Sequence, residues 1–295
     1  MNTPRAILIA GPTASGKSAL ALDLAHTRGG VIVNADSMQI YRELAIISAR
    51  PTLQDTELAP HRLYGHVPAR QAHSVGLWLD EVAVVIRQAH TDGLVPILVG
   101  GTGLYFKALT EGLSPVPAIP AEVRTRWRDV ATQVGPGELH AVLAVRDAQM
   151  AARLAAADTQ RIVRALEVLE ATGRSLAWWQ EQPGVPVLDP AACERIVVTL
   201  ERDALNRRAE LRFAQMIASG AIEEAERFDA LGLDPALPAA RAIGLRPLIA
   251  HVRGTLSRED ACSAGLAETR AYIKRQLTWM RRFMSDWQVF TPRGR

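Results

Sequence analysis

Short runs of apolar residues recur along the chain, between longer stretches that mix apolar and polar positions. The runs at residues 6–10, 31–34 and 95–99 are rich in Val, Ile and Leu, and a fourth run at 195–200 follows much later. Short runs without polar alternation are typical of strands buried on both faces of a parallel sheet. Residues 19–25, between the first two runs, are rich in Ala and Leu and predict a helix. The pattern therefore predicts an α/β fold in which helices flank a parallel sheet.

The middle of the chain has a helical pattern and is bounded by prolines. From residue 121 to about 182 it is rich in Arg, Ala and Leu, with one break at Gly135-Pro136-Gly137. Proline-punctuated linkers precede and follow this stretch, at residues 115–120 and 185–190. A helical block between such linkers, followed by another strand, indicates an insertion into the α/β domain. We therefore expect a first part of the core at 1–117, a helical insertion at 118–187 and a second part of the core at 188–295.

Residues 270–284 have the periodicity of an amphipathic helix. One stripe is apolar, which predicts a face buried against the core, and it consists of Ile273, Leu277, Met280 and Met284. The opposite arc is cationic and consists of Arg270, Lys274, Arg275, Arg281 and Arg282. No acidic residue interrupts this arc, so its charges are not paired within the helix. A solvated face is one explanation, and contact with a nucleic-acid phosphate backbone is the one that we favour.

Composition adds limits to this picture. The chain has 295 residues, a net charge of +3 and a pI of about 9.1, which alone is weak evidence for nucleic-acid binding. Its two cysteines, Cys193 and Cys262, have no spacing that indicates a metal site or a disulfide scaffold. No apolar signal region precedes the first predicted strand, and no stretch is long enough to span a membrane. We therefore expect a cytoplasmic protein.

Residues 11–18 carry the most specific motif in the chain, G-x-x-x-x-G-K-[ST]. The motif lies between a predicted strand and a predicted helix, which is the setting of a phosphate-binding loop. Its backbone N–H groups and the helix N-terminus would cradle phosphate oxygens. Lys17 would reach the terminal phosphates, and Ser18 would hold a Mg²⁺ ion. The predicted diphosphate-binding positions of this loop are Gly11, Thr13, Ala14, Ser15, Gly16, Lys17 and Ser18.

Two further polar groups follow predicted strands. Asp36 comes after the run at 31–34, and Thr102 lies in a glycine-rich turn after the run at 95–99. Because parallel strands end at one edge of a sheet, we expect both residues to lie beside the phosphate-binding loop. A P-loop small-molecule or nucleotide kinase would use such a strand-end Asp to hold Mg²⁺. The loop motif alone does not decide which di- or triphosphate is bound.

Three of these segments together resemble a known family. GPTASGKS at 11–18, ADSMQIYR at 35–42 and VGGTGLYFKAL at 99–109, in this order, are similar to the bacterial tRNA dimethylallyltransferases. The resemblance continues at 158–168, 241–246 and 269–282, so it spans nearly the whole chain. The chain departs from the family pattern, which has Lys, His, Asn and Tyr in turn, at Arg50, Arg62, Ala157 and Leu245.

The resemblance implies a reaction. Members of this family transfer a dimethylallyl group from dimethylallyl diphosphate to N6 of the adenosine 3′-adjacent to the anticodon in tRNA, and they release diphosphate. The phosphate-binding loop and Mg²⁺ would then hold the departing diphosphate, which Arg208 would also contact. Asp36 would take the proton of the adenine amine or, alternatively, hold Mg²⁺. Thr102 would lie near the amine or the bridging oxygen.

The resemblance also implies a surface for the tRNA anticodon loop, whose single-stranded bases are open to recognition. The residues assigned to tRNA are Asp36, Ser37, Met38, Gln39, Thr102, Arg124, Gln160, Arg161, Ile162, Val163, Arg164, Arg241, Arg246, Lys274, Arg275, Gln276, Thr278, Trp279 and Arg281. The remaining alternatives are the kinase above and an enzyme that prenylates free adenine nucleotides. We expect a monomer without membrane contact.

Overall fold

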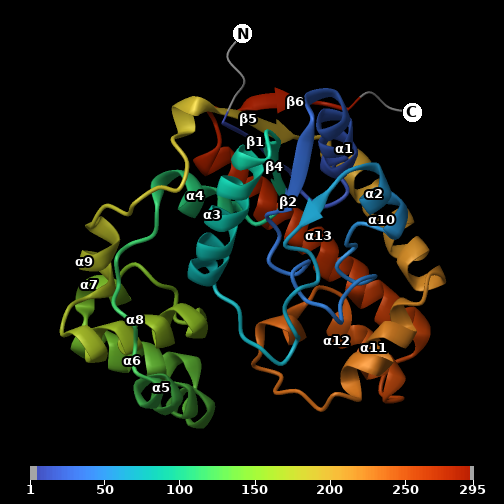
Figure 1. Ribbon diagram of the computed structural model, residues 1–295. Coiled ribbons are helices and arrows are strands. Elements are labelled where there is room, and N and C mark those ends of the chain that lie inside the picture. The colour runs from blue at the N-terminus through green and yellow to red at the C-terminus, as the bar shows by residue number, and fades with distance from the viewer. Residues whose placement is uncertain (1–4, 293–295) are drawn as a thin grey trace. The chain divides into compact units, whose positions relative to one another are not determined.

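The computed structural model describes residues 5–292, which divide into two compact units (Figure 1). The first unit comprises residues 1–110 and 187–295, and the second comprises residues 111–186. The first unit carries the phosphate-binding loop, and the second is helical. Among residues 5–292, no helix is both long and apolar enough to cross a membrane.

A six-stranded parallel sheet forms the centre of the first unit. Its order is β3-β2-β4-β1-β5-β6, and its strands are β1 (Ala6–Ala10), β2 (Gly30–Asn34), β3 (His61–Arg62), β4 (Val95–Gly100), β5 (Cys193–Val198) and β6 (Gln288–Phe290). Every residue of β1, β2 and β4 is buried, as their uninterrupted apolar runs predict. The parallel sheet flanked by helices is therefore confirmed.

The two outer strands have no comparable sequence signal. Strand β3 has two residues, and the three residues of β6 are all exposed. Both pair with a longer neighbour, β3 with β2 and β6 with β5. Such short edge strands present few unpaired backbone groups to solvent.

Helices of the first unit pack on this sheet and on one another. They are α1 (Lys17–Arg28), α2 (Leu53–Leu58), α3 (Val75–Thr91), α4 (Gly103–Glu111, whose last residue belongs to the second unit), α10 (Arg202–Ala218), α11 (Ala221–Asp229), α12 (Leu245–Val252) and α13 (Arg258–Phe283), with 3₁₀ turns η1 (Pro190–Ala192) and η2 (Pro238–Arg241). Helices α1 and α3 contact β2 and β4, whereas α13 contacts α10 and α12. The chain therefore brings the loop after β1, the loop after β2 and the helix α13 into one unit.

Helix α13 contains the amphipathic segment expected from the sequence. Ile273, Met280 and Met284 are buried and Leu277 is partly buried, so the predicted apolar stripe faces the core. The helix also extends twelve residues before the predicted start, back to Arg258. This first half approaches α10 closely, since a Cβ on Gly265 would lie 2.6 Å from Cζ of Phe213. Small residues permit this approach, and they leave no strong apolar stripe in the sequence.

The second unit is a cluster of five helices, α5 (Ala121–Gln133), α6 (Pro136–Arg146), α7 (Ala148–Ala151), α8 (Thr159–Thr172) and α9 (Leu176–Glu181). Its core includes Leu139, Leu143, Ile162 and Leu166, all fully buried. The compact unit begins at residue 111, before the prolines that mark the expected boundary at 117. A Cβ on Gly184 would lie 2.6 Å from the carbonyl carbon of Gly112, so the incoming and outgoing segments touch before the first proline.

Candidate active site

The phosphate-binding loop connects β1 to α1 by a tight turn. Ala14 and Gly16 have positive φ angles of 62° and 96°, and Gly16 is the N-cap residue of α1. A Cβ on Gly11 would lie 2.6 Å from Oγ of Ser15 and 2.8 Å from the carbonyl oxygen of Val198, so glycine is required there. The helix N-terminus and its free N–H groups thus border the loop, as an anion site requires.

Lys17 is held within this loop. Its ammonium donates a hydrogen bond to the carbonyl oxygen of Pro12 at 3.3 Å. Burial, followed by repulsion from Arg212, lowers the pKa of Lys17 to about 8, and attraction by Asp36 opposes the change. A lysine with a lowered pKa is stabilised in its charged form when an anion binds beside it. The loop therefore has the electrostatics of a phosphate site.

A cavity of about 250 Å³ opens beside the loop. Thr13, Lys17 and Ser18 line it from the phosphate-binding loop and the start of α1, and Asp36 lines it from the end of β2. Further lining residues come from α10 and α13 and include Arg212, Tyr272 and Arg275. The cavity thus combines cations, two aromatic rings and one carboxylate.

The segment after β2 holds Asp36 by a set of local hydrogen bonds. The backbone N–H of Asp36 donates to Oδ1 of Asn34 at 2.8 Å, and Oδ1 of Asp36 accepts from the backbone N–H of Met38 at 3.0 Å. The side-chain amide of Asn34 in turn donates to the backbone oxygens of Asp36 and Leu63. One carboxylate oxygen of Asp36 is therefore used to shape the turn.

Thr102 lies against the same turn. Its Oγ1 accepts a hydrogen bond from the backbone N–H of Ser37 at 3.0 Å and lies 3.4 Å from Oγ of Ser37. The carboxyl ends of β2 and β4 thus meet, as the strand-end placement predicts. In this geometry Thr102 positions the turn that carries Asp36.

Gln276 joins the two loops of the site. Its Oε1 accepts from the backbone N–H of Thr13 at 2.9 Å, and its Nε2 donates to the carbonyl oxygen of Gly101 at 3.0 Å. The residue is 4% exposed. Both ends of the Gln276 amide thus bind backbone groups inside the protein, and a contact of this residue with tRNA stays a prediction.

Arg212 is a site residue for which the sequence predicted no role. It donates to Oγ1 of Thr13 at 3.4 Å and to the carbonyl oxygen of Ala49 at 3.3 Å. Burial lowers its pKa, and the nearby Asp36 partly opposes this. Arg208 lies one helical turn earlier on α10, and its Nη1 would be 3.6 Å from a Cβ on Gly16. The four-residue spacing of the two arginines puts them on one face of the helix and could have identified both.

Comparisons with known proteins agree on one family. A family model described as IPP transferase matches residues 39–283, and a model described as isopentenyl transferase matches residues 4–73. The tRNA dimethylallyltransferase of Methylocella silvestris is 53% identical over 98% of this chain and 95% of that protein. The tRNA dimethylallyltransferase of Chelativorans sp. is 50% identical over 96% of this chain and 97% of that protein. The chain belongs to the tRNA dimethylallyltransferase family.

Solved structures are similar over nearly the whole chain. The tRNA isopentenylpyrophosphate transferase of Bacillus halodurans has a TM-score of 0.69 and 29% identity, over 98% of this chain and 90% of that chain. A eukaryotic dimethylallyltransferase acting on tRNA has a TM-score of 0.82, over 98% of this chain and 74% of that chain. Its identity is 24%, so this second likeness concerns the fold alone.

The first unit contains most of the residues that the family resemblance assigns to tRNA. Ser37, Met38 and Gln39 line the cavity with Asp36, and so do Arg241 and Arg275. On α13, Lys274, Arg275, Thr278 and Arg281 are exposed. Arg246 is also exposed and donates to the carbonyl oxygen of Ala240 at 3.4 Å. A ligand can reach the exposed side chains on α13 and α12, and their contact with tRNA stays a prediction.

Three residues on or near this surface have partners within the protein. Nε2 of Gln39 donates to the carbonyl oxygens of Ser48 and Ala49, both at 3.0 Å. Trp279 is partly buried, with its ring 4.4 Å from that of Phe283. Arg270 pairs with Glu210 of α10, so one charge of the cationic arc on α13 is neutralised by an acidic residue that lies far away in sequence.

The second unit carries the other residues assigned to tRNA. Arg124 on α5 and Gln160 and Arg161 on α8 are exposed, whereas Val163 and Arg164 are partly buried. Arg161 pairs with Asp158 at 3.2 Å, and Arg164 pairs with Glu167 at 3.5 Å. The Ile162 side chain is fully buried in the core of this unit, and a contact of this residue with tRNA stays a prediction.

The departures from the family pattern have local structural partners. Arg50 donates to the carbonyl oxygens of Tyr41 and Arg42, at 3.3 and 3.4 Å. Arg62 donates to the carbonyl oxygen of His61 at 3.0 Å, and Leu245 is fully buried. Three of the four substituted positions therefore make contacts within the first unit, whereas Ala157, in the second unit, is exposed.

Proposed function

We propose that this chain transfers a dimethylallyl group from dimethylallyl diphosphate to N6 of the adenosine 3′-adjacent to the anticodon in tRNA. One observation carries the proposal: a single cavity is lined by Lys17 and Ser18 of the phosphate-binding loop and by the Asp36 carboxylate. A diphosphate leaving group needs the loop residues Lys17 and Ser18, and an adenine amine needs a carboxylate such as that of Asp36. Membership of the tRNA dimethylallyltransferase family supports this assignment and gives no support to a P-loop kinase.

The phosphate-binding loop would stabilise the leaving group. As the allylic C–O bond breaks, its electron pair leaves with diphosphate, whose charge grows near Lys17, Arg208 and Arg212. A preorganised donor aimed at such developing charge contributes a factor of roughly 10²–10³ in rate. Oγ of Ser15 is buried and has no hydrogen-bond partner within residues 5–292, so it can donate to a diphosphate oxygen.

We also propose that Mg²⁺ accompanies the diphosphate. Ser18 and Asp36 both line the cavity, and oxygen ligands of this kind suit Mg²⁺ together with phosphate oxygens. Mg²⁺, when bound, would neutralise charge on the departing diphosphate. The Ser18 hydroxyl would hold the Mg²⁺ ion. Asp36 would be a second Mg²⁺ ligand only if another group takes the proton of the amine.

Asp36 would act on the adenine amine. The lone pair of this amine is delocalised into the ring, so the amine attacks well only as its proton is removed. The new C–N bond forms at the allylic carbon, and the proton passes to the Asp36 carboxylate. Its turn is held by Asn34, Met38 and Thr102, so the carboxylate keeps its position during the reaction.

The RNA would be bound through the cationic side chains of the protein. The target base must leave its stack, which costs a few kcal/mol and least in a single-stranded loop. Exposed Lys274 and Arg281 on α13 are suited to contact phosphates around the anticodon loop. We propose that the enzyme acts as a monomer in the cytoplasm.

Nucleoside analysis tests the proposed function directly. The protein is incubated with dimethylallyl diphosphate, Mg²⁺ and unmodified tRNA, and the digested nucleosides are analysed by mass. The expected product is dimethylallyladenosine from tRNA, with one diphosphate released per transfer. A parallel reaction with free AMP and ATP separates the alternatives, because product from these alone would favour a prenyltransferase for free nucleotides. Phosphate release from ATP without prenyl transfer would favour a kinase.

A further inference from the structure

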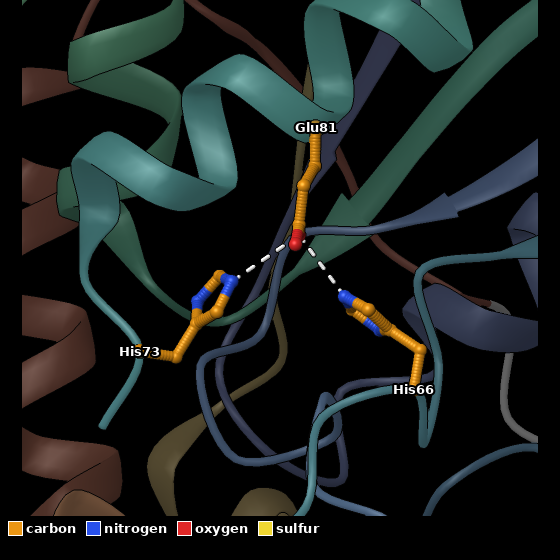
Figure 2. A group of neighbouring side chains, drawn as sticks. All are labelled: His66, His73 and Glu81. Atoms are coloured by element: carbon orange, nitrogen blue, oxygen red, sulfur yellow. Dashed lines mark hydrogen bonds and ion pairs between the residues drawn. The ribbon is translucent and has the colours of Figure 1, made fainter. Parts of the chain in front are cut away.

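Two histidines and a glutamate converge outside the cavity. His66 follows β3, His73 lies just before α3, and Glu81 projects from α3 toward both rings (Figure 2). Nε2 of His66 is 3.0 Å from Oε2 of Glu81, and Nε2 of His73 is 3.2 Å from the same oxygen. One atom from each residue lies within 4.8 Å of the other two. The three side chains thus form one compact group of potential metal ligands.

Nε2 of His66 is hydrogen-bonded to Oε2 of Glu81, but the hydrogen bonding of the other ring nitrogens is incomplete. The His73 side chain is 2% exposed, yet neither ring nitrogen has a well-aligned hydrogen-bond partner among residues 5–292. Nε2 of His73 is near Glu81 without the angle of a hydrogen bond. Nδ1 of His66 is likewise buried without a partner in the described part of the chain. A buried imidazole nitrogen without a partner is unfavourable, and an ion between the two Nε2 atoms and the carboxylate would give Nε2 of His73 a partner.

Two of the three ligand separations suit a small tetrahedral ion, and the two imidazole ligand atoms lie within 4.8 Å of each other. Ligand atoms about 2.0–2.1 Å from a tetrahedral Zn²⁺ are roughly 3.3 Å from one another. The distances of 3.0 and 3.2 Å to Glu81 are close to that value. Two imidazoles and one carboxylate favour Zn²⁺ over Mg²⁺ or Ca²⁺, which prefer oxygen ligands. We infer that His66, His73 and Glu81 bind one Zn²⁺ ion.

Solvent can reach this site. The side chains of His66 and Glu81 are 32% and 36% exposed, so one side of the group is open. Zinc sites with three protein ligands commonly complete their coordination with water. A fourth position at the open side would therefore be occupied by a water molecule.

The ion would brace the turn that carries Asp36. The backbone N–H of Gly65 donates to the carbonyl oxygen of Gln39, and Val67 and Ile40 are paired in the same way. The segment that carries His66 is thus hydrogen-bonded to the segment that follows Asp36. Glu81 lies on α3, whose Trp78 donates to the carbonyl oxygen of Asn34 at 2.9 Å. Zn²⁺ would tie α3 to the loop next to the cavity.

Metal binding alone tests this inference. Protein freed of metal with a chelator is titrated with Zn²⁺ by calorimetry, without dimethylallyl diphosphate or tRNA. We expect one Zn²⁺ per chain, and we expect Co²⁺ to give the absorption bands of a four-coordinate site with nitrogen ligands. Millimolar Mg²⁺ should not compete. Absence of a one-to-one Zn²⁺ site in the folded wild-type protein would overturn the inference, and it would leave the proposed prenyl transfer untouched.

Variants identify the ligands. Glu81→Gln and His73→Gln should each weaken Zn²⁺ binding by about 10-fold or more. His26→Gln, at an exposed histidine on α1, is the matched control and should bind Zn²⁺ like the wild type. Circular dichroism checks that each variant is folded, and the half-exposed His66→Gln provides a second test where His73→Gln does not fold. Unchanged Zn²⁺ affinity in folded Glu81→Gln and His66→Gln would show that the ion binds elsewhere.

Discussion

Asp36 is the residue on which the proposed chemistry depends most. Asp36→Asn keeps the size of the side chain and removes the proton acceptor, so single-turnover prenyl transfer should fall by about 10²–10⁴-fold. Affinity for tRNA, measured by filter binding, should change little. The exposed Asp23→Asn on α1 is the matched control. Transfer at near wild-type rate by Asp36→Asn would assign the proton to another group.

Lys17 makes diphosphate binding depend on pH. In the free protein its pKa is about 8, and a bound diphosphate should raise it by favouring the ammonium. Below pH 8 Lys17 is charged with or without ligand, so its contribution is constant. As the pH rises above 8, binding must take up a proton, and affinity should fall about 10-fold per pH unit.

The pH profile is measured with dimethylallyl diphosphate between pH 7 and 9.5, where the diphosphate itself is already ionised. Lys17→Arg is the informative control, since arginine keeps its charge throughout this range. Its profile should be flat even if its affinity is lower. An equally steep decline in Lys17→Arg would assign the titration to a different group.

Gln276 shows a limit of prediction from sequence at the residue scale. The phosphate-binding loop and Asp36 could be predicted, because a local motif and a strand end define them. The role of Gln276 depends on contacts with Thr13 and Gly101, which are far away in sequence. Arg212 became evident for the same reason, through Thr13 and Ala49. Long-range partners such as these decide whether a polar side chain faces a ligand or the protein.

The structure predicts a stability effect for Gln276. Gln276→Ala leaves the backbone groups of Thr13 and Gly101 without their partner, so the free energy of unfolding should fall by about 1–3 kcal/mol. Urea denaturation measures this, with the exposed Gln215→Ala as control. The affinity of the folded variant for tRNA should stay near that of the wild type. A large loss of tRNA affinity at unchanged stability would instead support the RNA contact that the resemblance implies.

Helix α13 combines predicted and unpredicted features at the scale of an element. Its apolar stripe follows from the periodicity, whereas the close packing of Gly265 on Phe213 depends on small residues that carry little pattern. Tertiary contacts also occupy some of the charged side chains of the cationic arc. Arg270 is paired with Glu210, and Arg275 lies over the ring of Tyr272 and lines the cavity. Lys274 and Arg281 are therefore the better probes of RNA binding.

The double variant Lys274→Gln, Arg281→Gln should weaken tRNA binding. Each lost phosphate contact reduces the salt dependence, so the slope of log K against log salt should become shallower by up to about two. The apolar stripe is unchanged, which should leave the fold intact. Arg28→Gln with Arg87→Gln, exposed on α1 and α3, removes the same charge elsewhere. Equal slopes in the two double variants would mean that the arc on α13 is only a solvated surface.

At the scale of the whole molecule, the α/β core and the helical unit are predictable to different degrees. The core strands β1, β2 and β4 are buried on both faces, so each is encoded by an uninterrupted apolar run that predicts a strand. The edge strands β3 and β6 are too short for a pattern and form only because longer strands offer them partners. The start of the helical unit at residue 111 depends on Gly112 and Gly184, whose contact no local signal in the sequence reveals.

The contact between Gly112 and Gly184 places the two ends of the helical unit side by side. The backbone N–H groups of Val187 and Leu188 both bind the carbonyl oxygen of Leu109, so the chain leaves the core and returns to it at one point. If the segment between Leu109 and Val187 were replaced by another folded segment, no extra linker would be needed to reconnect the chain to the core. Helices of another length or number could therefore be joined between these two residues without a change in the connectivity of the core.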